Sequence, residues 1–190
     1  MLNNLSNFIA RLYSLRLLLS LLAAIAFFFW LFNFSTLPLS NPALKLAGNG
    51  GELLDMRLYY TAQEAFREMN RYGAEGRAVY LRFLSVDFLF ALTYGLAFSL
   101  LLTRLTRALF GPASSWSRLN LLPIGIALMD WLENCCLLLM LIRFPEQNVF
   151  IGTAAGIATL AKWVLTAVTM AVLIVTGLLL LTRQLRSSRK

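Results

Sequence analysis

The sequence predicts an all-α membrane protein, in which four transmembrane helices form a bundle with a short amphipathic helix on its outer side. Hydrophobic residues make up 59% of the 190 residues, whereas a typical soluble domain holds about 45–50%. They are concentrated in four runs, each long enough to cross a hydrocarbon core, which takes about 20 helical residues. The alternating ten-residue segments of a β-barrel are absent from the sequence. We therefore expect helices, which satisfy every backbone polar group without water.

The four apolar runs define the expected spanning helices of a single transmembrane domain that covers residues 1–190. They are residues 17–37, 78–102, 119–141 and 150–181. The first run follows Arg11 and Arg16, as a signal peptide would, but we interpret it as a spanning helix. Near the start of the fourth run, Gly152 and Gly156 predict a close helix contact, because small residues four apart let backbones approach.

The distribution of basic residues predicts how the chain is oriented. Lys and Arg are enriched in cytoplasmic loops, and here they gather at both ends of the chain and between the second and third runs. These residues are Arg11, Arg16, Arg104, Arg107, Arg118, Arg183, Arg186, Arg189 and Lys190. We expect a bacterial inner membrane protein with both termini in the cytoplasm. The net charge of +8 then reflects topology and attraction to membrane lipids, and we expect no nucleic-acid partner.

Residues 38–77 form the expected extracytoplasmic segment. Pro38, Pro42 and the glycine-rich residues 48–51 predict turns. Thr61 and Glu64 then predict a capping box, which opens an amphipathic helix over residues 62–72. Three interpretations of this helix stay open: packed on the outer end of the bundle, lying in the lipid interface, or acting as a mobile lid. Tyr59 and Tyr60 suit an interfacial aromatic belt.

Polar residues inside the apolar runs predict a functional site. The third run carries Asp130, Glu133 and Asn134, which share one helix face at spacings i, i+3 and i+4. The second run has Asp87 between Tyr80 and Tyr94, and the fourth has Lys162 within a stripe of threonines. Charged side chains in a bilayer are costly and usually face the protein interior.

We therefore expect one buried acidic site that opens outward. The expected catalytic residues are Asp130, Glu133, Asp87 and Lys162, and the expected substrate-binding residues are Asn134, Tyr80, Tyr94, Arg77, Arg82 and Thr166. Three acids face few cations, so we expect Asp130 and Glu133 to share a proton. Asn134 is expected to donate to whichever of the two is ionised.

Cofactors and metals have little support in the composition. The chain has no histidine, which removes nearly all zinc and copper sites, although a carboxylate-held magnesium or calcium stays open. Cys135 and Cys136 are adjacent, so they cannot easily bridge, and we expect both to be buried apolar residues. No cofactor and no metal are therefore expected.

Several short motifs resemble those of small bacterial four-helix integral membrane proteins of unassigned function. They are Y-T-A-Q-E-A, G-A-E-G-R-A-V-Y, D-F-L-F, D-W-L-E-N and T-L-A-K-W, which begin at Tyr60, Gly73, Asp87, Asp130 and Thr159. The resemblance implies that the following residues act as one set: Gly76, Arg77, Asp87, Asp130, Glu133, Asn134, Lys162 and Trp163.

Three functions stay open at this point. The first is an intramembrane acid–base enzyme acting on a lipidic or isoprenoid-like substrate, with Asp130 and Glu133 as proton donor and acceptor and Lys162 stabilising developing negative charge. The second is a proton- or cation-coupled carrier or channel component, which with four helices would require a homo-oligomer. The third is a non-catalytic membrane scaffold or assembly partner.

Overall fold

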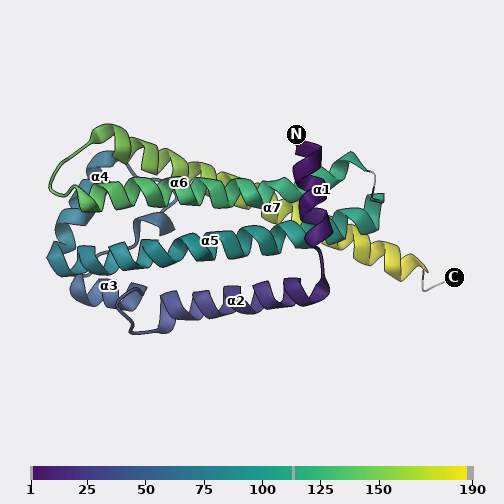
Figure 1. The fold of residues 1–190 in the computed structure, drawn as a ribbon, viewed down its shortest axis with the longest axis horizontal. Coiled ribbons are helices and arrows are strands. Elements are labelled where there is room, and N and C mark those ends of the chain that lie inside the picture. The colour runs from purple at the N-terminus through teal and green to yellow at the C-terminus, as the bar shows by residue number, and fades with distance from the viewer. Residues whose placement is uncertain (1, 113, 188–190) are drawn as a thin grey trace.

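The computed structural model describes residues 2–112 and 114–187, and all regular structure within them is helical. Four helices are long and apolar enough to cross a membrane. They are α2 (Leu15–Phe34), α5 (Gly73–Phe110), α6 (Leu122–Ile142) and α7 (Val149–Ser187). All four run along the long axis of the molecule (Figure 1). The four predicted apolar helices are confirmed, whereas Arg189 and Lys190, which entered the orientation argument, lie outside the described residues.

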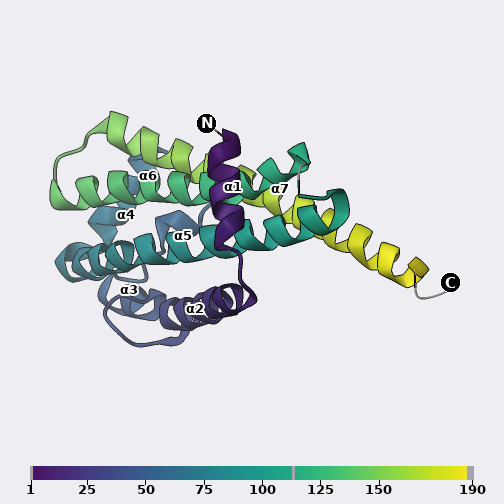
Figure 2. The ribbon, with the colours of Figure 1, turned by 45° about the vertical axis from the view of Figure 1, so that its right-hand side comes forward.

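α6 packs against both α5 and α7, while α2 packs mainly on α5. Figure 2 shows α2 on the side of α5 away from α6. Aromatic rings fill the contact between α2 and α5. The centroid of the Phe32 ring lies 4.5 Å from that of Phe83 and 5.7 Å from that of Phe90. The opposite face of α2 exposes Phe27, Phe29 and Trp30. An apolar surface of this extent suggests a membrane-embedded protein.

A helix that the sequence analysis did not predict, α1 (Leu2–Leu12), lies crosswise at the end of the long helices (Figures 1 and 2). Its buried side, with Ser6 and Ile9, faces the 3₁₀ helix η2 (Ser115–Leu121) and α5. Ser6 donates to the carbonyl of Ser117 at 3.2 Å, and the Asn120 amide donates to the carbonyl of Ser6 at 3.2 Å. The helix is strongly amphipathic, a local signal that the sequence analysis did not use.

The opposite end is closed by α3 (Asn41–Ala47), the 3₁₀ helix η1 (Leu54–Met56) and α4 (Ala62–Arg71). The sequence predicted only turns around Pro42. The structure instead starts α3 there, because Ser40 caps the helix and proline is favoured in a first turn. The capping box of Thr61 and Glu64 is confirmed. α4 contacts α7 and α5. Of the three open interpretations, the structure therefore shows the one in which this helix packs against the long helices.

The chain around the start of α4 crosses α7 at Gly152 and Gly156. A Cβ atom on Gly156 would overlap the carbonyl oxygen of Tyr60, and one on Gly152 would lie 2.7 Å from the Cβ of Ala62. The predicted close contact therefore exists, but its partner is the start of α4 rather than another long helix. Gly177, further along α7, has no atom near its Cβ position within 4 Å.

This difference between two glycines of one helix gives a matched test. Gly156→Ala should lower the free energy of unfolding by about 1–3 kcal/mol, because the rigid Tyr60 backbone must move. Gly177→Ala should leave it unchanged or raise it by up to about 1 kcal/mol, since alanine is the better helix former. Denaturant unfolding in detergent, followed by circular dichroism, measures both. Equal effects of the two substitutions would contradict the crossing.

Candidate functional site

Lys162 is the centre of a buried polar network. It lies on α7 and is 7% exposed. Its ammonium nitrogen Nζ lies 2.7 Å from Glu133 Oε2 and 3.1 Å from Asp130 Oδ1, and it donates to the backbone carbonyl of Asp55 at 3.2 Å. An ammonium group has three N–H bonds, so all three are engaged.

α6 presents Asp130 and Glu133 to Lys162 because the two residues are one turn apart on the same helix face. Glu133 is fully buried, and its Oε1 accepts from the hydroxyls of Tyr60 at 3.1 Å and Thr159 at 2.6 Å. Asp130 Oδ2 accepts from the Tyr94 hydroxyl at 2.7 Å. The ammonium group bridges the two carboxyl groups, and their sharing of a proton stays a prediction.

Two further buried acids lack such a cation. Within the described residues, the Asp87 side chain on α5 accepts a hydrogen bond only from the Asn134 side-chain amide, at 2.8 Å, and Asp55 on η1 accepts from the Tyr80 hydroxyl at 3.4 Å. Among the described residues, neither side chain forms an ion pair. Asn134 was expected to donate to Asp130 or Glu133, and this expectation is wrong. It lies 100° around α6 from Glu133, so it faces α5.

A cavity of about 280 Å³ joins these acids to apolar residues of four helices. Its lining consists of Ile25, Asp55, Met56, Asp87, Phe90, Tyr94, Phe98, Ile126, Asp130, Lys162, Trp163, Thr166 and Met170. The charged groups occupy one end, under η1. The stretch of α5 from Asp87 to Phe98 extends about 16 Å at 1.5 Å per residue, so the cavity is an elongated apolar slot with an acidic end.

Asp55 and Tyr60 are the site residues that sequence reasoning missed. Both belong to the segment that was expected to lie outside, and Tyr60 was assigned to an interfacial belt. The structure corrects this assignment, because Tyr60 is fully buried and donates to Glu133. The available signal was Leu53–Leu54 directly before Asp55. Leu54 is fully buried, and this apolar pair holds the neighbouring carboxylate against the helices.

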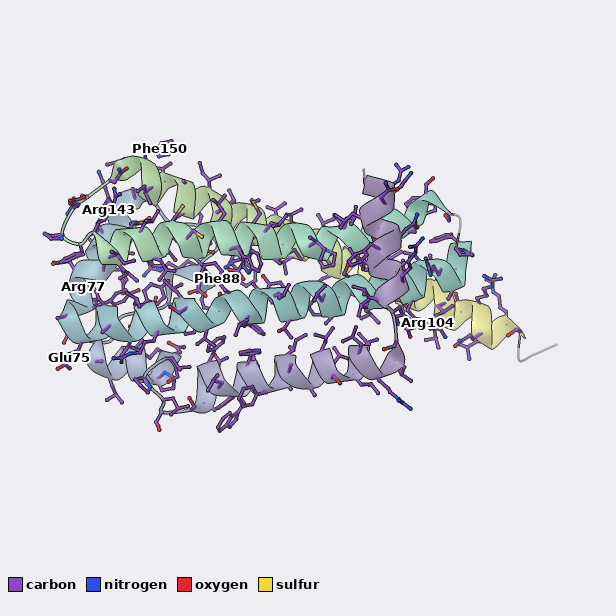
Figure 3. The ribbon with its side chains drawn as sticks, in the orientation of Figure 1. Glu75, Arg77, Phe88, Arg104, Arg143 and Phe150 are labelled. Carbon is purple, nitrogen blue, oxygen red and sulfur yellow. The ribbon has the colours of Figure 1, made fainter. Side chains whose placement is uncertain are left out.

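Five of the ten predicted site residues do not line the cavity, and two of these, Arg77 and Arg82, also lie away from its wall. Arg82 is exposed on α5, because five residues separate it from Asp87 and rotate it about 140° around the helix. Arg77 donates to the carbonyl of Met69 at 3.1 Å, and its guanidinium lies 3.8 Å from the centre of the Phe144 ring. Figure 3 shows Arg77 near the end of the molecule that also carries Arg143. Arg77 therefore ties α4 to the loop after α6.

The remaining predicted residues lie in or behind the cavity wall. Tyr94 and Thr166 line it, and the Thr166 hydroxyl donates back to the carbonyl of Lys162 at 2.8 Å. Tyr80 is fully buried behind Asp55. The expectation for the cysteines is wrong for one of the pair, because Cys136 is buried but Cys135 is exposed. Within the described residues, no group of three or more Cys, Asp or Glu is arranged to hold a metal ion.

Asp55 changes charge near neutral pH. Burial raises the pKa of this carboxyl from 3.8 to about 7, since the ionised form loses its hydration. The Lys162 ammonium acts in the opposite direction, and the charges of Glu133 and Asp130 raise the pKa further. The nearest basic residue in its own segment, Arg57, pairs instead with Glu68 at 3.3 Å. An acid with a pKa near the working pH is suited to general acid–base chemistry.

Removing the central ammonium should destabilise the protein strongly. Lys162→Met should cost about 3–5 kcal/mol of unfolding free energy, because it leaves buried carboxylates without their partner. Adding Asp130→Asn and Glu133→Gln to this variant should recover much of the loss. The matched control is Lys45→Met, since Lys45 is exposed on α3. Thermal and denaturant unfolding in detergent measure all three, and equal stability of the two Lys→Met variants would exclude the network as a stabilising element.

Asp55 should make stability fall as the pH rises. Between pH 3.8 and about 7 the folded protein holds a proton on Asp55 that the unfolded chain has already lost. Over this window the contribution of Asp55 to the free energy of unfolding declines by an amount on the order of 4 kcal/mol. Asp55→Asn should lack this decline, whereas Glu52→Gln, at an exposed neighbour, should keep it. Unfolding free energies at pH 4.5, 6 and 8 give the comparison. If the unfolding free energies of wild type and Asp55→Asn change in parallel with pH, the raised pKa of Asp55 is refuted.

Comparisons of the chain with protein-family models, curated proteins and solved structures found no significant match. A functional conclusion therefore depends on the geometry of this site.

Proposed function

We propose that this chain is an intramembrane acid–base enzyme acting on a lipidic or isoprenoid-like substrate. One observation carries the proposal. An apolar cavity shared by four helices ends at two buried carboxyl groups, Asp55 and Asp87, that form no ion pair with any described residue. A mostly apolar pocket with a few convergent polar groups is the usual form of a site for small molecules.

The membrane setting is part of the proposal. Four long apolar helices and the apolar residues on their outer faces support a bilayer. The distribution of Lys and Arg supports a bacterial inner membrane with both termini in the cytoplasm. In this orientation η1 and α4 lie on the outer side and cover the acidic end of the cavity.

The proposed proton donor and acceptor are Asp55 and Asp87, in place of the pair Asp130 and Glu133. Asp130 and Glu133 are engaged by Lys162, and each also accepts from at least one hydroxyl. Their role is to fix the shape and charge of the acidic end. One carboxylic acid transfers a proton to a substrate carbon, and the facing carboxylate removes a proton from a neighbouring carbon. Such an isomerisation balances without a further reactant.

Substrate entry is proposed from the side. η1 closes the end where the site was expected to open outward, since Leu54 is fully buried there. The cavity lining instead includes Ile25 of α2 and Trp163 of α7, both partly exposed. α2 packs mainly on α5 and α3, which leaves the gap between α2 and α7 as the route for a lipid from the bilayer.

The buried polar residues beyond the cavity argue against a carrier. A carrier needs a polar path that continues to the other side of the membrane. Towards α1 a group of buried neutral residues forms hydrogen bonds that cross between elements: Ser99 donates to the carbonyl of Asn120, and the Asn120 amide donates to Thr103 at 2.9 Å. These bonds attach α5 to η2. Among the described residues, no particular contact supports the homo-oligomer that a carrier would need.

Incorporation of solvent deuterium into lipid tests the enzyme proposal. Purified protein is placed in nanodiscs made from bacterial membrane lipids and incubated in D₂O, and the extracted lipids are analysed by mass spectrometry. One lipid class should gain deuterium at carbon, and Asp87→Asn should slow this gain by about 10²–10⁴-fold. Glu75→Gln, at an exposed acid of the same helix, is the matched control and should be unchanged.

The outcome separates the enzyme from the scaffold. A scaffold exchanges no carbon-bound hydrogen, so the wild-type lipids would then match those of protein-free nanodiscs. That result, or equal exchange by wild type and Asp87→Asn, would refute the proposed chemistry.

A further inference from the structure

We propose that the substrate of this site is an amphiphile with a cationic, amine-type head group, which pairs with one lone pair of the Asp87 carboxylate and leaves the others for proton transfer, while its chain lies along the apolar length of the cavity. This inference rests on the proposed lipid-binding function and adds the class of head group. It follows from which charges and hydrogen-bonding atoms the cavity leaves unused.

The charges of the lining exclude an anionic head group. Among the described residues that line the cavity, Asp55, Asp87 and Asp130 are acids and Lys162 is the cation. All three N–H bonds of Lys162 are engaged by Glu133, Asp130 and the Asp55 carbonyl. Even with Asp55 protonated, two lining carboxylates face one ammonium. A phosphate, diphosphate or fatty-acid carboxylate would meet repulsion and no free donor of positive charge.

The hydrogen-bonding groups of the acidic end are short of donors. Asp87 Oδ2 accepts from Asn134, and within the described residues Oδ1 has no donor. Asn134 Oδ1 also has no donor among the described residues, but it lies outside the cavity lining, whereas Trp163 Nε1 is an unpartnered donor of a residue that lines the cavity. Buried acceptors in native proteins are almost always paired. The unused Oδ1 of Asp87 is therefore the acceptor that an occupant of the cavity reaches, and an ammonium group supplies a donor to it.

Aromatic side chains provide independent support. Phe90, Tyr94 and Trp163 line the same cavity. The rings of Phe90 and Tyr94 lie 5.3 Å apart between centroids, and the Tyr94 hydroxyl is held by Asp130 at 2.7 Å, which fixes the orientation of its ring. Aromatic faces attract cations, and this attraction strengthens when water is excluded. Carboxylates surrounded by aromatic rings are the pattern expected for an organic ammonium group.

A neutral hydroxyl head group fits less well than an amine. An alcohol has one O–H to donate, so it pairs with one acceptor and leaves the excess negative charge of the lining in place. An ammonium group pairs with Asp87 through a charge-assisted hydrogen bond, which is about twice as strong as a neutral one. Comparing head groups on one chain length therefore separates the two.

The test uses three probes with the same twelve-carbon chain: dodecylamine, 1-dodecanol and dodecanoate. Each is titrated into the full-length protein in a non-ionic maltoside detergent at pH 7, with binding followed by calorimetry and by the shift in unfolding temperature. Dodecylamine should bind about tenfold more tightly than dodecanol, and dodecanoate should bind most weakly. Asp87→Asn should weaken the amine about tenfold and barely affect the alcohol. Glu75→Gln should match wild type.

Each outcome bears either on the head-group inference or on the proposed function. Tighter binding of dodecanoate than of dodecylamine, or unchanged amine affinity in Asp87→Asn, overturns the head-group inference. Equal binding of all three probes also overturns it, but leaves the lipid cavity of the proposed function in place. Binding of none of them refutes that cavity and the proposed function with it. If Asp87→Asn does not fold, the wild-type order of the three probes decides. Phe98→Trp, which fills the apolar end, should then weaken amine and alcohol alike.

Discussion

The arrangement of the site depends on one buried ammonium group with three acceptors. Lys162 draws together α7, α6 and the loop that contains η1, through Glu133, Asp130 and the Asp55 carbonyl. Because both carboxyl oxygens of Glu133 are engaged, the hydroxyls of Tyr60 and Thr159 are fixed in turn. A buried charge without partners is far more costly than one that is paired. The same group therefore sets the position of the outer loop and determines which acids remain unneutralised at the cavity.

The remaining acids explain why the cavity resembles a reaction site more than a structural contact. A structural network would end once its charges were paired, as at Glu68, which Arg57 and Arg71 surround. Asp87 and Asp55 instead face a space lined with apolar and aromatic side chains. Leaving them so costs stability, and natural proteins place such costs at functional sites. The donor-poor surroundings of Asp87 point in the same direction.

The sequence predicted the helices and half of the site, and the division has a physical reason. Asp130, Glu133 and Lys162 were found because a charge within an apolar helix must face inward, and helical spacing then brings the three together. The partner of Asn134 was missed because α6 contacts α5 on one side and α7 on the other, and residues 100° apart on α6 face different neighbours. Asp55 was missed because a loop has no periodicity. Its position follows from Leu54 packing against helices distant in the sequence.

The length of α2, the shortest of the four long helices, bears on how deep the cavity would lie in the proposed bilayer. α2 has 20 residues, which span about 30 Å, whereas α5 and α7 have 38 and 39 and extend well beyond that length. In a bilayer about 30 Å thick, α2 and the 21-residue α6 both match the hydrocarbon layer, and α2 indicates depth. Phe32, near the C-terminal end of α2, packs against Phe83 of α5, and Phe28 lies beside Phe90. Asp87 falls between these two levels. In the proposed bilayer orientation, the acidic end of the cavity would lie just below the head-group layer, at the depth where a lipid changes from polar to apolar.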